Sequence, residues 1–160
     1  MSEDKVINLA ALFSGIDKQI QMNEFEDKVA TQKIVYLAQQ SGIELGYNFE
    51  WYLRGPYCKE VSDNAHIIID SGIKSTPNEA GLDEERIKAF RDVLHPYLDD
   101  PEWLEIAGSL VYLRNEHYPD RKINEIVGYL LNDLSYGYKN FSESLVRRVL
   151  AEILRIGFIQ

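Results

Sequence analysis

The sequence contains few of the residues from which catalytic and metal-binding sites are usually built. Its 160 residues include one cysteine, Cys58, and three histidines, His66, His95 and His117. None of the histidines lies at a metal-ligand spacing from another histidine or from the cysteine, and no H-E-x-x-H pattern, glycine-rich phosphate loop or G-x-S-x-G elbow occurs. We therefore expect no metal, no cofactor and no enzymatic activity, because an active site would have to assemble from scattered residues.

Basic residues and long apolar runs are also scarce. The 17 lysines and arginines are outnumbered by 26 acidic residues, and the formal net charge of −9 predicts weak attraction to nucleic acid. The apolar runs are far shorter than the ~20 residues that a helix needs to cross a bilayer. We expect no secretory signal, because residues 1–5 are acidic and lead into no apolar region of the kind that such signals have. With one cysteine and hence no intramolecular disulfide, these features favour a cytoplasmic protein without a membrane partner.

Most of the chain has the apolar spacing of amphipathic helices. The helices are expected near residues 4–14, 23–40, 59–71, 83–97, 103–116, 122–134 and 143–156. A polar connector is expected at 74–81 and a turn at 135–140. A chain of this length fits one domain, so the predicted fold is mainly α. It is a compact multi-helix domain over residues 1–160 with a small β element, and a winged-helix arrangement is one form that it could take.

The helix expected at 23–40 has apolar residues on more than one face. Met22, Phe25 and Val29 begin one apolar stripe, and the rest of the helix fills further faces with Ile34, Val35, Leu37 and Ala38. A helix that is apolar on several faces is usually buried. We therefore expect this helix to lie at the centre of the core.

Glycines mark several helix ends and one helix interior. Four expected helix ends have a glycine followed by a large apolar residue, which favours left-handed glycine caps. These glycines are Gly15, Gly42, Gly72 and Gly157. Gly108 lies instead inside a helix, where it costs about 1 kcal/mol relative to alanine. We expect a close helix crossing at that position.

Residues 47–53 have the alternating pattern of a strand with one buried face. The apolar members of the pattern are Tyr47, Phe49, Trp51 and Leu53. A turn is expected directly afterwards, because Gly55 allows positive φ and Pro56 cannot donate to a sheet. The next helix starts after Cys58, which we interpret as a small buried cap residue and not as a nucleophile.

The strand and the turn also concentrate aromatic residues. Tyrosine and tryptophan are favoured at protein interfaces because they bury a large area yet keep a polar tip, and the chain contains ten tyrosines. We expect Tyr52, Arg54 and Tyr57 to be exposed. The prediction is that a partner protein binds here, with a second copy of the chain as a further candidate. The candidate residues are Tyr52, Arg54, Gly55, Pro56, Tyr57 and Glu60.

A DNA-binding regulator is the alternative hypothesis. Arg147 and Arg148 are the best local basic feature, and the last three expected helices could form a helix-turn-helix or winged-helix unit that presents them to a groove. The other interpretation is that the two arginines solvate the outer face of their helix beside Glu143 and Glu152. Little further basic charge lies in this region, so nucleic acid is the less favoured partner.

The stretch from Lys33 to Val61 resembles a known family signature. It reads K-x-x-Y-L-A followed by F-E-W-Y-L-R-G-P-Y-C-K-E-V, and it is similar to the SocA/Panacea domain and to the related YwgA-like prokaryotic proteins. In that signature a helix ending near Y-x-A is followed by a strand that runs into G-P and then x-E-(V/L). The segment Leu104–Leu113 resembles a helix further along such proteins. The matching positions are Lys33, Tyr36, Trp51, Gly55, Pro56 and Glu60.

This resemblance implies a mainly helical domain with a small β element. For the Panacea group it also implies an antitoxin that neutralises a partner toxin by protein contact. The chain departs from the pattern at Cys58, where the related pattern has serine, and at Arg54, where tyrosine or lysine is commoner. The functional hypothesis is therefore a non-enzymatic, antitoxin-like interaction module of a prokaryotic cytoplasm, with the identity of its partner left open.

Overall fold

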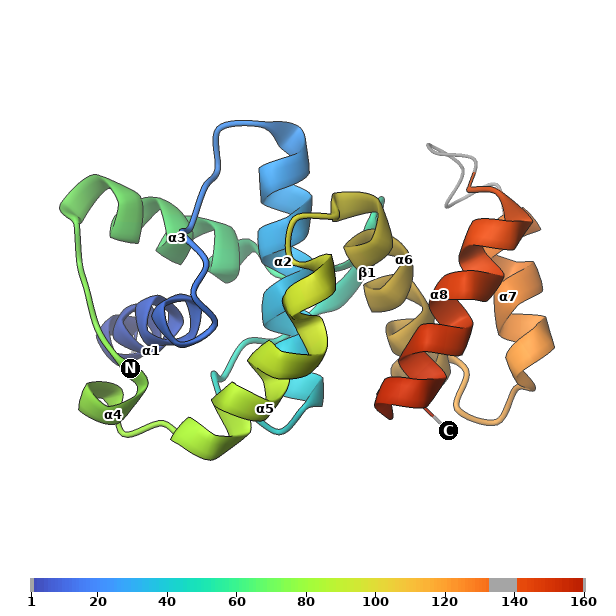
Figure 1. The fold of residues 1–160 in the computed structure, drawn as a ribbon. Coiled ribbons are helices and arrows are strands. Elements are labelled where there is room, and N and C mark those ends of the chain that lie inside the picture. Colours follow the sequence, from blue (N-terminus) through green and yellow to red (C-terminus); the bar gives the residue numbers. More distant parts are fainter. Residues whose placement is uncertain (1, 133–140, 160) are drawn as a thin grey trace.

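A computed structural model of the chain describes residues 2–132 and 141–159. It confirms a mainly helical fold with a small two-stranded sheet (Figure 1). The helices are α1 (Ser2–Gly15), α2 (Phe25–Gln40), α3 (Lys59–Ser71), α4 (Pro77–Ala80), α5 (Glu84–Leu94), α6 (Pro101–Tyr112), α7 (Ile123–Asn132) and α8 (Glu143–Ile156). A 3-10 turn, His95–Tyr97, follows α5, and a π-helical turn, Leu113–His117, extends α6.

The expected helices all have counterparts in the structure. The polar connector expected at 74–81 contains the one-turn helix α4, and the turn expected at 135–140 lies outside the described residues. Within the two described ranges, no helix has the length and apolar character needed to cross a membrane.

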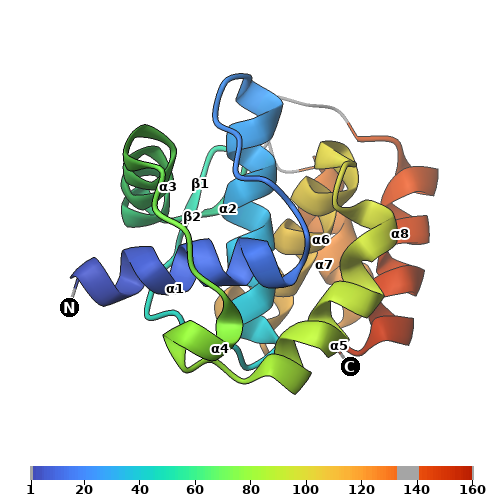
Figure 2. The same ribbon diagram turned by 60° about the vertical axis from the view of Figure 1, so that its left-hand side comes forward.

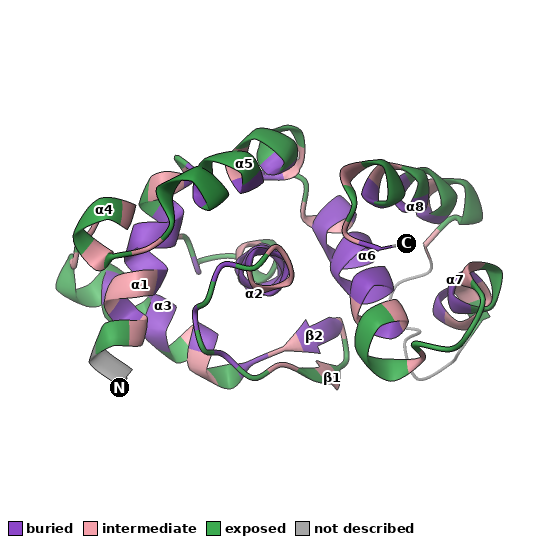
Figure 3. Ribbon diagram, turned by 90° about the horizontal axis from the view of Figure 1, so that it is seen from below, coloured by how far each residue is buried: buried purple, intermediate pink, exposed green. Residues whose placement is uncertain are grey.

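Helix α2 lies at the centre of the fold. Seen end-on in Figure 3, it is surrounded by α1, α3, α5, α6 and the two strands. Every residue from Val29 to Ala38 is buried, which confirms that this helix is central to the core. Helices α1 and α3 pack together at one end of the molecule, and α7 and α8 pack on α6 at the other (Figure 2).

Helix α6 crosses α2 closely at a glycine. A Cβ atom on Gly108 would lie 3.3 Å from Cδ of Lys33, a side chain of α2. All residues of α6 from Trp103 to Val111 are buried. The close crossing predicted at Gly108 is therefore confirmed, because a larger residue there would displace the lysine.

The strands β1 (Glu50–Tyr52) and β2 (Gly55–Tyr57) form an antiparallel hairpin in which Trp51 pairs with Pro56. The hairpin connects α2 to α3 in sequence, and β2 packs against α2 and α6. In Figure 3 the hairpin and α8 lie on opposite sides of α6. The sheet is therefore placed against the central helices and not beside the last helix.

The strand predicted at 47–53 is confirmed only at residues 50–52. Tyr47 precedes β1, and its backbone bonds to the side chain of Gln39 instead of to a neighbouring strand. Leu53, which the alternation placed on the buried face, lies in the turn and is 44% exposed. The alternation fails there because the chain has already left the sheet to reverse direction.

Three of the four predicted glycine caps have positive φ, namely Gly42, Gly72 and Gly157. The prediction for Gly15 is wrong, because the left-handed residue after α1 is Asp17, with φ of 58°. At Gly15 the requirement is space: a Cβ atom would lie 2.7 Å from both Ile87 and Pro77. This glycine lets α1 approach α4 and α5.

A β-carbon added at Gly55 should disturb the packing of the hairpin against α6. Gly55 has φ of +97°, and a Cβ atom there would clash with Oγ of Ser109. We expect Gly55→Ala to lower the free energy of unfolding, measured by urea denaturation, by roughly 2–3 kcal/mol.

Gly72→Ala is the matched control, because Gly72 also has positive φ (+70°) but has open space around its Cα. It should cost only about 1 kcal/mol. Ser109→Ala should recover part of the Gly55→Ala loss, since it removes the clashing oxygen. Equal losses for the two glycine variants would contradict this description of the hairpin.

Candidate functional site

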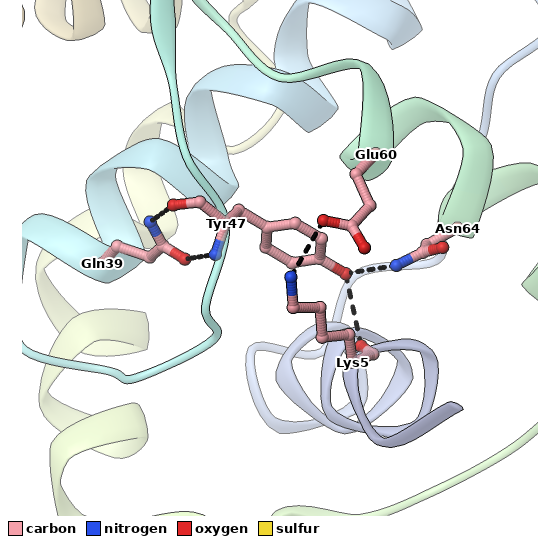
Figure 4. A network of polar contacts seen from close by, with 5 residues as sticks. All are labelled: Lys5, Gln39, Tyr47, Glu60 and Asn64. Atoms are coloured by element: carbon pink, nitrogen blue, oxygen red, sulfur yellow. Dashed lines mark hydrogen bonds and ion pairs between the residues drawn. The ribbon is translucent and has the colours of Figure 1, made fainter. Parts of the chain in front are cut away.

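The hairpin and its flanking residues are attached to α2 by two glutamine side chains. The Gln32 amide donates to the Cys58 carbonyl oxygen (2.9 Å) and accepts from the Cys58 N–H (2.9 Å). Gln39 makes the same pair of bonds with the backbone of Tyr47, at 2.9 and 2.8 Å (Figure 4). Each amide thus replaces a neighbouring strand as the hydrogen-bond partner, and segment 47–58 is fixed to α2 at both ends.

Lys33 attaches the turn itself. Its Nζ donates to the Pro56 carbonyl oxygen at 2.7 Å, and its side chain is 2% exposed. Burial lowers the pKa of Lys33 to about 7, although Glu105 on α6 acts in the opposite direction and Arg54 adds to the lowering. The structure therefore brings together residues that the family resemblance singled out only by position: Lys33, Gly55 and Pro56.

Aromatic side chains fill the space behind the hairpin. The ring of Tyr36 lies 5.2 Å from that of Phe49 in an edge-to-face arrangement and 5.8 Å from that of Tyr112. The Trp51 ring lies 5.4 Å from the Tyr112 ring. Phe49 and Trp51 are half-buried against the core, as expected from the alternating pattern. This packing leaves the opposite side of the hairpin to solvent.

A pocket of about 480 Å³ opens between the outer side of the hairpin and α2. Three large apolar side chains around it are strongly exposed: Phe25 (52%), Tyr52 (59%) and Leu53 (44%). The Arg54 guanidinium lies 4.9 Å above the Phe25 ring, a cation–π contact. We call this set the hairpin surface; it is defined by Phe25, Tyr52, Leu53, Arg54 and Tyr57.

The residues predicted to bind a partner occupy three different environments. Tyr52, Arg54 and Tyr57 line the pocket together, with the two tyrosine rings 5.4 Å apart. Gly55 and Pro56 are buried beneath it and support the turn. Glu60 is not among the pocket residues, and its role in partner binding stays a prediction.

Glu60 belongs to a polar network that is shown in Figure 4. It forms an ion pair with Lys5 of α1 (2.9 Å). The Tyr47 hydroxyl donates to the Lys5 carbonyl oxygen and accepts from Asn64 of α3. Burial raises the pKa of Tyr47 to about 12, so this hydroxyl keeps its proton. The network joins α1 and α3 to the segment before the hairpin.

Sequence reasoning missed Gln32, Gln39 and Phe25 as parts of this site. Phe25 was placed in the apolar stripe of α2, yet it points to solvent at the edge of the pocket. The two glutamines bond to backbone groups 8 and 26 residues away. The spacing of residues in the sequence does not predict such bonds. A glutamine on a helix is normally taken to be solvent-exposed, and only the position of the partner segment shows that it is hydrogen-bonded.

The structure places the cysteine at the start of a helix. Cys58 is the buried N-cap of α3, as predicted, and its side chain makes no capping bond. Among the residues that the structure describes, no group of three histidine, cysteine or carboxylate side chains is placed to hold a metal ion.

Arg147 and Arg148 lie at the surface of α8, each beside an acidic residue. Arg147 Nε is 2.9 Å from a carboxylate oxygen of Glu143, and Arg148 Nε is 3.9 Å from one of Glu152. Both pairs are four residues apart on the helix. The DNA-binding alternative requires positive charge on α8. Each of the two arginines lies beside one carboxylate, which offsets its positive charge locally.

No protein-family model, curated protein or solved structure matches the chain. The resemblance to the Panacea and YwgA-like signatures therefore stays a prediction carried by residues 33–61. The functional argument that follows is based on the hairpin surface and its support.

The buried lysine should make stability depend on pH in a defined direction. The ordinary pKa of a lysine is 10.5, and in the folded protein that of Lys33 is about 7. Between these values the unfolded chain holds a proton that the folded chain lacks, so stability rises with pH. Relative to Lys33→Met, the wild type should gain about 1 kcal/mol for each pH unit between pH 7.5 and 9.5.

Urea denaturation of both proteins at several pH values measures this difference. Lys33→Met keeps the long apolar stem beside Gly108 but removes the titrating group. The other ionisable groups are common to the two proteins, so their effects cancel in the comparison. Parallel stability curves would show that the Lys33 amine is not desolvated as described.

Proposed function

We propose that this chain binds another protein through the hairpin surface and acts by binding, not by chemical transformation. The observation that carries the proposal is the exposure of Phe25, Tyr52 and Leu53 around one pocket. Large exposed apolar residues that gather around a concave site are typical of interaction sites. Tyrosine and arginine, which both occur here, are enriched among residues that dominate binding energy.

The support beneath the surface favours the same proposal. The hairpin that carries Tyr52, Leu53 and Arg54 is bonded to α2 just after them, where the buried side chains of Lys33 and Gln32 reach the backbone of residues 56 and 58. A surface that is already ordered loses little conformational entropy on binding. The hairpin can therefore present its side chains in one arrangement to a partner.

The family resemblance suggests what kind of partner this is. In the Panacea group the domain neutralises a toxin by protein contact, and we extend this to the present chain as an antitoxin-like module of a prokaryotic cytoplasm. The residues that carry the resemblance include Lys33, Gly55 and Pro56, which shape the support of the hairpin surface. A partner that recognises this surface would depend on them indirectly.

DNA and a second copy of the chain are the competing partners. Arg147 and Arg148 are exposed, but the acidic residues beside them reduce the local positive potential. In the chain as a whole, acidic residues outnumber basic ones by nine. We therefore favour a protein partner at the hairpin surface, and the experiment below separates the three cases.

The test is to recover the partner with the tagged wild-type chain from its native host, purify it, and measure its affinity for two double variants. Tyr52→Ser with Leu53→Ser should weaken binding at least about tenfold, or 1.4 kcal/mol. Ile67→Ser with Ile69→Ser is the matched control, because these α3 residues are 46% and 45% exposed and lie outside the pocket; it should change affinity less than twofold.

Three results would count against the proposal. Equal loss of affinity in both double variants would place the interface elsewhere. Recovery of DNA whose binding is lost in Arg147→Gln with Arg148→Gln would support the alternative. A dimer in sedimentation experiments that dissociates when Tyr52 and Leu53 are changed would mean that the surface binds a second copy of the chain.

A further inference from the structure

The pocket at the hairpin surface differs in charge from the rest of the chain. Its lining includes the cationic residues Lys28 and Arg54 and no aspartate or glutamate; the Lys33 amine also lines it but is buried and bonded to the Pro56 carbonyl oxygen, and burial lowers its pKa to about 7. The chain as a whole has a net charge of −9. A positive, partly apolar hollow on an acidic protein favours an anionic occupant, since it attracts a carboxylate that the surrounding surface repels.

The two cations and the Lys33 amine are held in different ways. Arg54 is half-buried: its guanidinium lies over the Phe25 ring, and Glu105 lies behind it at 3.8 Å. Lys33 is fixed by its bond to the Pro56 carbonyl oxygen. Lys28 lies on the exposed face of α2, one turn before Gln32, and makes no ion pair with the described residues. Arg54 is therefore oriented in advance, and Lys28 is free to move toward a ligand.

The remaining lining is mainly apolar or aromatic, and its polar members are Gln32 and Ser62. Val29 forms part of its wall, and Phe25, Tyr52, Leu53 and Tyr57 surround it. A wall of this kind can pack against a bulky apolar group of a ligand, and the cations next to it can bind a negatively charged group. A ligand that fits this pocket would carry an apolar group and a negatively charged group close to each other.

We propose that the hairpin surface recognises a peptide segment of the partner in which a large apolar side chain stands next to a carboxylate. The apolar side chain enters the pocket, and the carboxylate binds the Arg54 guanidinium with Lys28 nearby. Arginine suits this role because its planar group can donate two parallel hydrogen bonds to one carboxylate. This inference rests on the function proposed above and adds to it the chemistry of the segment recognised.

A peptide fits these observations better than a fatty acid, which also combines apolar and anionic parts. Phe25, Tyr52 and Leu53 remain about half exposed around the opening. An acyl chain lying there would stay in contact with water. A peptide side chain would instead be covered by the rest of its own protein, which would also cover these three residues.

The test uses the whole chain and short synthetic peptides. The probe is acetyl-Gly-Ser-Trp-Asp-Ser-amide, compared with the same peptide carrying asparagine for aspartate and with one carrying serine for tryptophan. Titrations are followed by isothermal calorimetry or by NMR shifts of the protein. The aspartate peptide should bind at least fivefold more tightly than either control peptide, and sodium decanoate should bind more weakly than the aspartate peptide.

Two protein variants locate the carboxylate. Arg54→Gln and Lys28→Gln should each reduce the affinity for the aspartate peptide and reduce its advantage over the asparagine peptide. Lys88→Gln is the matched control, because Lys88 is an exposed lysine of α5 outside the pocket, and it should leave both affinities unchanged. Lys28 is exposed, so its variant keeps the test valid if Arg54→Gln fails to fold.

Equal affinity of the aspartate and asparagine peptides for the wild type would overturn the inference, as would binding of decanoate alone or of no probe. These failures are separable from failure of the proposed function. If the purified partner still loses affinity with the Tyr52 and Leu53 changes but not with Arg54→Gln and Lys28→Gln, the interaction site stands and only the carboxylate recognition is wrong.

Discussion

Three polar side chains on the central helix α2 fix the position of the hairpin. Gln32, Lys33 and Gln39 of α2 bond to the backbone of Cys58, Pro56 and Tyr47. Gln32 and Lys33 are buried and Gln39 is half-buried, and buried polar groups are costly unless they are hydrogen-bonded. The helix and segment 47–58 therefore satisfy each other: without the segment the helix would bury unpaired polar groups, and without the helix the segment would lack partners for its backbone.

This mutual dependence explains how a two-stranded hairpin, which alone would be marginal, can carry a defined surface. One side packs its aromatic residues on the core through Tyr36 and Tyr112. The turn is seated on α6 at Ser109 because Gly55 has no side chain. With its inner side and both ends fixed, the hairpin leaves Tyr52 and Leu53 on the outside, where burial in the fold gives them no role. Arg54 lies beside them, half-buried and paired with Glu105. The exposed position of Tyr52 and Leu53 is the reason for proposing a binding function.

The sequence predicted the helices, the close crossing at Gly108 and three of the four glycine caps, because each follows from local periodicity or backbone geometry. It overextended the strand to Leu53, since alternation does not reveal where the pairing partner ends. It placed Phe25 on the apolar stripe of α2, yet Phe25 is exposed, because periodicity indicates a face of a helix but not whether a neighbour covers it. The glutamine bonds could not be predicted, since they join segments whose spacing only the fold determines.

The central claim is that α2 holds segment 47–58 as firmly as it holds its own turns. Native-state hydrogen exchange of the Tyr47 and Cys58 amides measures this directly, because both donate to glutamine side chains and not to the backbone. The account predicts that they exchange within about tenfold of the buried amides of α2, which open only with the core. Exchange as fast as that of the exposed residue Asn48 would show that the hairpin is a loose attachment and would contradict the account.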